Sequence, residues 1–338
     1  MKSKKISIAD IATTLNISTM SVSRALSGKM GISEELRLKI AQKAKELGYS
    51  NQKSDSHINI LILHQMPFIQ DNSNFSTMVQ GIEKSIQAAK VDYSIEFVDK
   101  DNQENLYLPC KLSKGKSFDG VIFIGSFNKA YTQFIQHKIK SQVFYAGYSP
   151  SYDYDSVGSN FNNGGYKQCE HLIKKGHKNI GFIGNTDFFR NKERMLGITS
   201  ALEDYELPVK KEFFLNLENT TEELIVGLIK GDAQLTAIIC QWDFTAIRLI
   251  KTFHEHGLSV PRDISIIGSG NTEMSTLSQP SLTTLDLHLE YSCEIAVELL
   301  LKRIANPDKP SEAILVNSTL VERDSVKSII RCYTGLKD

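Results

Sequence analysis

The side chains best suited to recognising a polar surface lie close together near the N-terminus. Arg24 has a planar guanidinium that can donate two hydrogen bonds to one guanine edge. Hydroxyl or apolar side chains precede it at Thr19, Met20, Ser21 and Ser23. Such a set can contact bases only if one rigid element presents it to the major groove of DNA. The residues around Arg24 therefore have to form a helix with these side chains on its outer face.

Hydrophobic spacing predicts three helices in the first fifty residues. Ser7, Ser18 and Ser33 each precede an apolar run, and a serine at that position can cap the first turn of a helix. The Ser7-x-x-Asp10 spacing resembles a capping box. The apolar runs have helical periodicity: Ile8, Ile11, Ala12 and Leu15; Val22, Ala25 and Leu26; Leu36, Ile40, Ala44 and Leu47.

Two short helices about three residues apart, followed by a longer one, are typical of a helix-turn-helix. In that motif the start of the second helix reaches base edges, which here means Thr19 to Arg24. Ser7, Ser18 and Ser33 lie at helix starts, where free N–H groups can meet phosphates. A three-helix bundle that binds a protein has the same periodicity, so this alternative stays open.

Charge is distributed unevenly along a chain whose net charge is zero. Residues 1–56 contain ten Lys/Arg against five Asp/Glu, and the rest contains 29 against 34. A basic end joined to an acidic body fits a polyanion-binding module on a regulatory or oligomerising domain. The alternative is a solvated basic face.

The composition indicates an ordinary globular chain. Its 338 residues suggest two or three domains, and no apolar run reaches the roughly 18 residues of a membrane span. No signal-peptide core follows the basic N-terminus, so we expect a cytoplasmic protein. The five cysteines are widely spread without a Cys-x-x-Cys pair, so neither a disulfide framework nor a zinc site is expected.

The remaining residues alternate strand and helix patterns. This alternation predicts parallel sheets covered on both faces. The number of repeats predicts two doubly wound subdomains, with a ligand cleft at the carboxyl ends of the strands. The strand candidates are Ile58–Leu63, Tyr93–Val98, Gly120–Gly125, Gln142–Ala146, Asn179–Gly184, Thr236–Cys240 and Asp263–Gly268.

Motifs for catalysis are incomplete. Gly115-Lys116-Ser117 lacks the first glycine of a phosphate-binding loop, and Gly268-Ser269-Gly270 lacks the third glycine of a dinucleotide fingerprint. His254 and His256 are two residues apart and point to different sides of a helix. We therefore expect no catalytic site, metal or cofactor, while an α/β enzyme remains an alternative.

The N-terminal residues resemble the headpiece of the lactose/galactose-repressor (LacI/GalR) family. The matching pieces are Ser7–Ser27 with its Val22-Ser23-Arg24 core, Ile32–Arg37 and Glu46–Tyr49. The resemblance implies that Thr19 and Met20 occupy variable specificity positions and that Arg24 contacts a base. Family members insert a leucine from a hinge helix into the minor groove. The polar linker 50–57 has neither a leucine nor a helical stripe, so it does not predict that wedge.

The rest of the chain resembles the same family and, through it, the periplasmic sugar-binding proteins. The matching pieces include Gln80–Ile82, Phe118–Val121, Gly176–Gly184 and Pro261–Gly268. The resemblance implies an all-α helix-turn-helix headpiece plus an α/β periplasmic-binding-protein-like effector domain of two doubly wound parallel-sheet subdomains. The expected boundaries are 1–49 for the headpiece, 50–57 for the linker, 58–157 plus 288–317 for one subdomain, and 158–287 plus 318–338 for the other.

Six residues are candidates for effector binding. Arg194 matches a family arginine that hydrogen-bonds the ligand, and a forked cationic donor suits hydroxyls, carboxylates or phosphates. Trp242 and Asp243 follow a strand, and the Trp242 ring can stack on a sugar or pack in the core. Gly147 and Gly270 replace frequent polar family contacts, so a larger, acidic or phosphorylated sugar, or no ligand, stays open. The remaining candidates, at strand ends or in matching pieces, are Gln65, Phe75 and Ser126.

The expected function is that of a transcription regulator, with repression as the expected action. A homodimer would bind a pseudo-palindromic operator, because two-fold protein symmetry mirrors the symmetry of the half-sites. A small ligand, expected to be a carbohydrate, would shift the DNA affinity. A transport-type carbohydrate-binding protein without DNA binding is the alternative.

Overall fold

The chain contains two compact units, Met1–Ile58 and Asn59–Asp338, each described by itself. The structure, a computed structural model, describes residues 6–26, 32–47, 58–66, 74–147 and 153–330. The expected linker 50–57 lies outside the described residues, as do the expected helix-ending residues Gly28 and Gly48.

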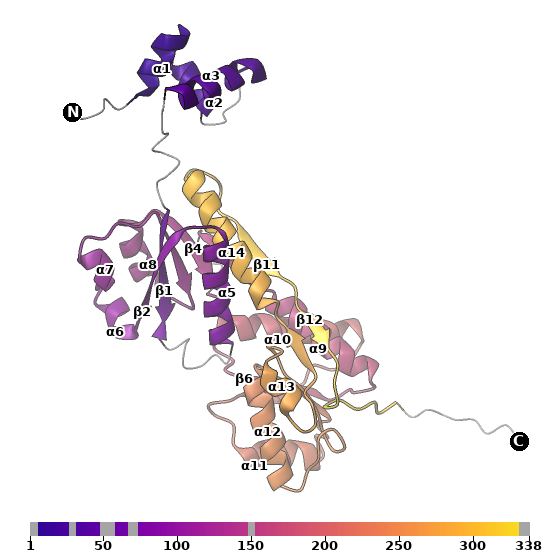
Figure 1. Cartoon of the computed structure of the whole chain (residues 1–338). Coiled ribbons are helices and arrows are strands. Elements are labelled where there is room, and N and C mark those ends of the chain that lie inside the picture. Colours follow the sequence, from indigo (N-terminus) through magenta and orange to yellow (C-terminus); the bar gives the residue numbers. More distant parts are fainter. Residues whose placement is uncertain (1–5, 27–31, 48–57, 67–73, 148–152, 331–338) are drawn as a thin grey trace, which may run out of the picture. The chain divides into compact units, whose positions relative to one another are not determined.

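Three helices form the described part of the first unit, as their periodicity predicts (Figure 1). They are α1 (Ile8–Leu15), α2 (Thr19–Leu26) and α3 (Glu34–Glu46). Their inward faces share one core built on Ile11, Ala12, Val22, Ala25, Ile40 and Ala44. Each of these helices is too short to be stable alone, so this shared core stabilises the unit.

A six-stranded parallel sheet lies at the start of the second unit, in the order β11-β5-β4-β3-β1-β2. Helices α5 and α14 cover one face, and α6, α7 and α8 cover the other (Figure 1). The strands are β1 (Asn59–Gln65), β2 (Asp92–Val98), β3 (Gly120–Ile124), β4 (Ser141–Tyr145), β5 (Asp155–Ser159) and β11 (Ala313–Val316). The helices are α5 (Phe75–Ala88), α6 (Lys100–Glu104), α7 (Cys110–Ser113), α8 (Lys129–Gln136) and α14 (Leu289–Ala305).

A second parallel sheet has the order β7-β6-β8-β9. Helices α9 and α10 pack on one face, and α11 and α12 pack on the other. The strands are β6 (Ile180–Gly184), β7 (Phe214–Asn216), β8 (Ala237–Cys240) and β9 (Ser265–Ile267). The helices are α9 (Phe161–Lys174), α10 (Phe189–Asp204), the 3-10 turn η1 (Lys211–Phe213), α11 (Glu222–Lys230) and α12 (Asp243–Glu255).

The chain passes between the two sheets after β5, after β10 (Thr284–Asp286) and after β11. Strand β10 follows the short α13 (Glu273–Leu277) and pairs antiparallel with β12 (Thr319–Val321). Polar side chains tie the passages together: Asn160 donates to Asn317 at 2.9 Å, and His288 Nε2 lies 2.9 Å from Thr319 Oγ1. The subdomain boundaries drawn from the resemblance stay a prediction.

All seven predicted strands are present, with ends that differ by up to two residues. The short strands β5, β7, β10, β11 and β12 were not predicted. Strand β5 has the sequence Asp-Ser-Val-Gly-Ser, and β11 is only partly buried. Strand β5 therefore lacks the apolar run by which the other strands were found. Strand β11 is an apolar run, Ala-Ile-Leu-Val, but its four residues make it shorter than every predicted strand.

Candidate functional site

The turn between α1 and α2 has the geometry that a helix-turn-helix needs. Asn16 ends α1 in the left-handed conformation, and its N–H donates to the carbonyls of Ala12 and Thr13. Ser18 begins the next helix, where its hydroxyl accepts a hydrogen bond from the Ser21 N–H at 3.0 Å. Asparagine tolerates this backbone conformation better than most residues, so the sequence favours a sharp turn at this point.

Helix α2 separates an inner apolar face from an outer face. Val22 and Ala25 are buried in the core of the first unit. Thr19, Met20, Ser23 and Arg24 are exposed, with 64% of Met20 accessible, while Ser21 is half-buried. Met20 and Arg24 lie at the surface and not in the core, so the outer face of α2 can meet a partner.

The serines at the helix starts act as caps. The Ser7 hydroxyl accepts from the Asp10 N–H at 3.3 Å, and the Asp10 carboxylate accepts from the Ser7 N–H at 2.7 Å. The Ser33 hydroxyl accepts from the Leu36 N–H at 3.4 Å. Both serines are exposed, so phosphate contact at Ser7, Ser18 and Ser33 stays a prediction beside this capping role.

A cavity of about 80 Å³ lies in the second unit, where the two sheets approach each other. Its wall combines aromatic and aliphatic side chains with a few polar groups, which is typical of ligand sites. Trp242 is the predicted effector residue that lines it. The lining residues are Asn74, Met78, Ala146, Gly158, Ser159, Asn160, Phe161, Asn162, Phe189, Arg190, Glu193, Trp242, Leu287, Leu289 and Leu315.

Trp242 is 6% exposed and joins the cavity wall to the core beneath it. Its ring meets Phe161 edge to face at 6.2 Å between centroids, and it packs with Leu285 and Leu287. Two guanidiniums lie near the same indole: the Cζ atoms of Arg190 and Arg194 are 5.4 and 5.8 Å from its centroid. The wall therefore places two cations against one electron-rich ring.

Arg194 lies fully buried behind this wall. Its Nη1 donates to the Gln241 carbonyl at 2.9 Å and to Asn191 Oδ1 at 3.4 Å, whereas Nε and Nη2 have no hydrogen-bond partner among the described residues. Burial and, to a smaller extent, the nearby charge of Arg190 lower the pKa of Arg194 to about 9. A buried cation with two unused donors is costly to the protein alone, so the site suits an added acceptor.

The other predicted effector residues have partners within the protein and are not among the residues that line the cavity. The Gln65 amide oxygen accepts from the Ser126 N–H at 2.8 Å, across the ends of β1 and β3. Phe75 packs edge to face on His64, whose pKa burial lowers to about 4. Asp243 is buried, and its carboxylate is bonded inside the fold.

Asp243 connects the start of α12 to the loop after β9 and to the first residue of β10. Its Oδ2 accepts from the N–H and hydroxyl of Thr272 at 2.8 and 2.9 Å, and its Oδ1 accepts from the Thr284 hydroxyl at 2.5 Å. Burial raises the pKa of Asp243, which these hydrogen bonds oppose. The carboxylate thus fixes the start of α12, directly after Trp242, against Thr272 and Thr284.

Sequence reasoning missed most of the polar cavity wall. Asn160 and Asn162 follow β5, and Arg190 and Glu193 lie on α10. The rule that selected Trp242, a polar or aromatic residue just after a strand, also selects Asn160 once β5 is known. Arg190 is four residues before Arg194, which places both on one face of a helix.

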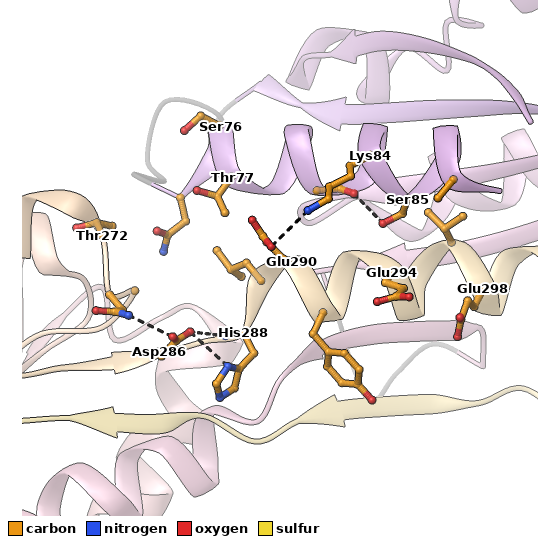
Figure 2. Close-up of a pocket in the computed structure, with 18 of the residues that line it drawn as sticks. Ser76, Thr77, Lys84, Ser85, Thr272, Asp286, His288, Glu290, Glu294 and Glu298 are labelled. Carbon is orange, nitrogen blue, oxygen red and sulfur yellow. Dashed lines mark hydrogen bonds and ion pairs between the residues drawn. The ribbon is translucent and has the colours of Figure 1, made fainter. Parts of the chain in front are cut away.

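A larger hollow of about 1100 Å³ runs along α5 and α14 (Figure 2). Glu290, Glu294 and Glu298 follow one another at four-residue spacing on α14, and Lys84 of α5 lies 3.8 Å from Glu290. At its other end His288 Nδ1 lies 3.5 Å from Asp286 (Figure 2). The predicted effector residues are not among those that line this hollow.

The part of the chain that the structure describes contains no cluster of three or more His, Cys, Asp or Glu side chains suited to a metal ion. None of its helices combines the length and apolar character needed to cross a bilayer.

Two family descriptions match the chain. Residues 7–52 match "Bacterial regulatory proteins, lacI family", and residues 169–326 match "Periplasmic binding protein-like domain". The first match contains all the predicted DNA-binding residues. The second contains α10 and Trp242.

Individual proteins with known names are similar over almost the whole chain. The probable HTH-type transcriptional repressor ExuR of Bacillus subtilis is 28% identical, with 96% of this chain and 99% of that protein covered. A LacI family regulator from Enterococcus faecium with bound ribose is 25% identical (TM-score 0.66; 80% of this chain, 99% of the other). The lac repressor dimer bound to operator and the anti-inducer ONPF is 19% identical (TM-score 0.67; 96% and 100%).

Proposed function

The chain belongs to the LacI family of bacterial regulatory proteins, and we propose that it is a sequence-specific repressor whose operator affinity depends on a small ligand. The observation that supports this most directly is the outer face of α2. Thr19, Met20 and Arg24 are exposed there while the inner face of the same helix is buried. Ser7, Ser18, Ser21, Ser23 and Ser33 complete the proposed DNA-binding set.

A homodimer on a pseudo-palindromic operator is the assembly that this reading requires. One helix-turn-helix covers a single half-site, and two-fold symmetry places a second one about a helical turn of DNA away. The headpiece is proposed to span residues 1–49, the linker 50–57 and the effector domain 58–338. A regulator of transcription works where the chromosome is, so we place it in the cytoplasm.

The effector is proposed to be a sugar or sugar derivative bound in the cavity beside Trp242. A ligand that prefers one arrangement of the two sheets shifts the population of that arrangement, and with it the DNA affinity. Trp242 lines this cavity, and Arg194 lies buried behind its wall. Gln65, Phe75, Ser126 and Asp243 would act through the elements that carry that wall.

Binding titrations with the full-length chain test the DNA-binding proposal. The probe is a duplex from the promoter region of the chain's own gene, and the competitor is a scrambled duplex of equal length. The wild type should prefer the promoter, whereas Arg24→Ala should remove the preference and leave the circular dichroism spectrum unchanged. Lys39→Ala is the control, because it removes one exposed positive charge from α3. Equal affinity of the wild type for both duplexes would overturn the proposal.

A further inference from the structure

We propose that the effector is an anion: the guanidiniums of Arg190 and Arg194 take the carboxylate or phosphate of a carbohydrate derivative. This inference rests on the proposed function in assigning the cavity beside Trp242 to the effector. It adds the charge of the ligand and a specificity residue, Arg190.

The first supporting observation is the arrangement of the two arginines. They are four residues apart on α10, so they lie on the same side of that helix. Arg190 Cζ lies 4.8 Å from the Phe188 centroid, and Arg194 Cζ lies 4.9 Å from that of Phe161, while both lie within 6 Å of Trp242. Aromatic faces hold both cations in place, and at Arg194 the Nε and Nη2 atoms remain to donate hydrogen bonds.

The second observation is that Arg194 lacks a charge partner. Within the ranges that the structure describes, it has no ion pair with a carboxylate, and its Nε and Nη2 are buried without an acceptor. Taking a cation out of water without an opposite charge is unfavourable, and a paired, hydrogen-bonded anion offsets that cost. The rings of Phe161 and Trp242 line the cavity and lie against this guanidinium, so an anion entering the cavity would approach it.

The third observation is the charge of the wall. Arg190 and Glu193 are the charged residues among those that line the cavity, and Arg194 lies directly behind them. Two guanidinium cations and one carboxylate therefore lie in this wall or directly behind it. Ser159, Asn160 and Asn162 supply neutral polar groups for the hydroxyls of the same ligand.

The direction in which two substitutions change the ligand affinity distinguishes an acidic ligand from a neutral one. For an anion, Arg190→Gln removes an attraction and Glu193→Gln removes a repulsion, so binding weakens in the first and tightens in the second. For a neutral sugar, Glu193 is a useful hydroxyl acceptor, so Glu193→Gln weakens binding. Arg190→Lys keeps the charge and should retain part of the affinity that Arg190→Gln loses.

Isothermal titration of the full-length protein provides the measurement. The probes are D-glucuronate against D-glucose, D-galacturonate against D-galactose, and glucose 6-phosphate against D-glucose. We expect at least one acid to bind about tenfold or more tightly than its neutral counterpart. Arg190→Gln should weaken the binding of that acid about tenfold. Glu193→Gln should tighten the same acid by a few fold. Binding of a uronate assigns a carboxylate site, and binding of the sugar phosphate assigns a phosphate site.

Three outcomes would overturn the inference: a neutral sugar that binds as tightly as its acid, no binding of any acid, or weaker acid binding in Glu193→Gln. The promoter titration on the same preparation separates these from failure of the proposed function. Specific promoter binding together with a neutral ligand removes only the anionic inference. Acid binding with no preference for promoter DNA removes the repressor proposal and leaves the ligand site.

Discussion

A methyl group added at Gly197 should force apart the helices that hold the cavity wall. A Cβ there would lie 2.9 Å from the Tyr166 nitrogen and closer still to the Asn162 carbonyl oxygen, both in the backbone of α9. Favourable non-bonded contacts need about 3.5–4.0 Å, so α10 has to move outward. Overpacking of this kind costs about 1–3 kcal/mol, and a contact with backbone belongs at the upper end. Alanine is about 1 kcal/mol more favourable than glycine in a helix, so the net destabilisation expected for Gly197→Ala is about 2 kcal/mol.

The matched control for this substitution is Gly227→Ala in α11. A Cβ at Gly227 meets nothing within 4 Å, so only the propensity gain of about 0.5–1 kcal/mol remains. Urea unfolding followed by the fluorescence of Trp242, the single tryptophan, measures both changes near the cavity. Equal stabilisation by both substitutions would refute the close approach of α9 and α10.

Salt should weaken promoter binding steeply, because Lys and Arg contacts release counterions from DNA; a flat response in a titration series would count against phosphate contact. Burial raises the pKa of Asp155, but hydrogen bonds from Arg303 and Lys309 outweigh it and hold that pKa below 3.8. Its ionised form thus stabilises the fold above pH 3.8, and Asp155→Asn should lower the urea midpoint at neutral pH yet reduce the loss on acidification. Burial lowers the pKa of His177 from 6.5 to about 4. On acidification the unfolded chain therefore binds this proton before the folded one, and stability falls as the pH drops from 6.5 to about 4. His177→Gln should flatten this decline in stability, and an unchanged slope of stability against pH would contradict its assignment to His177.

The headpiece was predictable because its determinants are local. Each helix has its cap within three residues and its apolar stripe within about two turns, so the sequence contains the start and inner face of every helix. The structure places Ile11, Val22 and Ile40 in one core, as those stripes predict. The exposure of Met20 and Arg24 follows from the same periodicity.

Strand β5 was not predictable in this way, because its burial depends on distant residues. Asp155 has no exposed side-chain surface, which a strand tolerates only when the charge is compensated. Arg303 comes from the end of α14 and Lys309 from the following loop, about 150 residues along the chain. Without those partners, a segment that begins Asp-Ser has the composition of a loop.

The cavity shows the same division between local and distant determinants. Helical spacing alone places Arg190 and Arg194 on one side of α10, so the pair is visible in the sequence. What the pair can bind depends on Phe161 and Trp242, which come from two other segments of the chain. Their rings lie against Arg194, whose charge is fully buried. Helix periodicity can therefore nominate ligand-binding arginines, whereas only the packing of the two sheets shows that Arg194 lacks an acceptor. For that reason the charge of the ligand could be argued only from the structure.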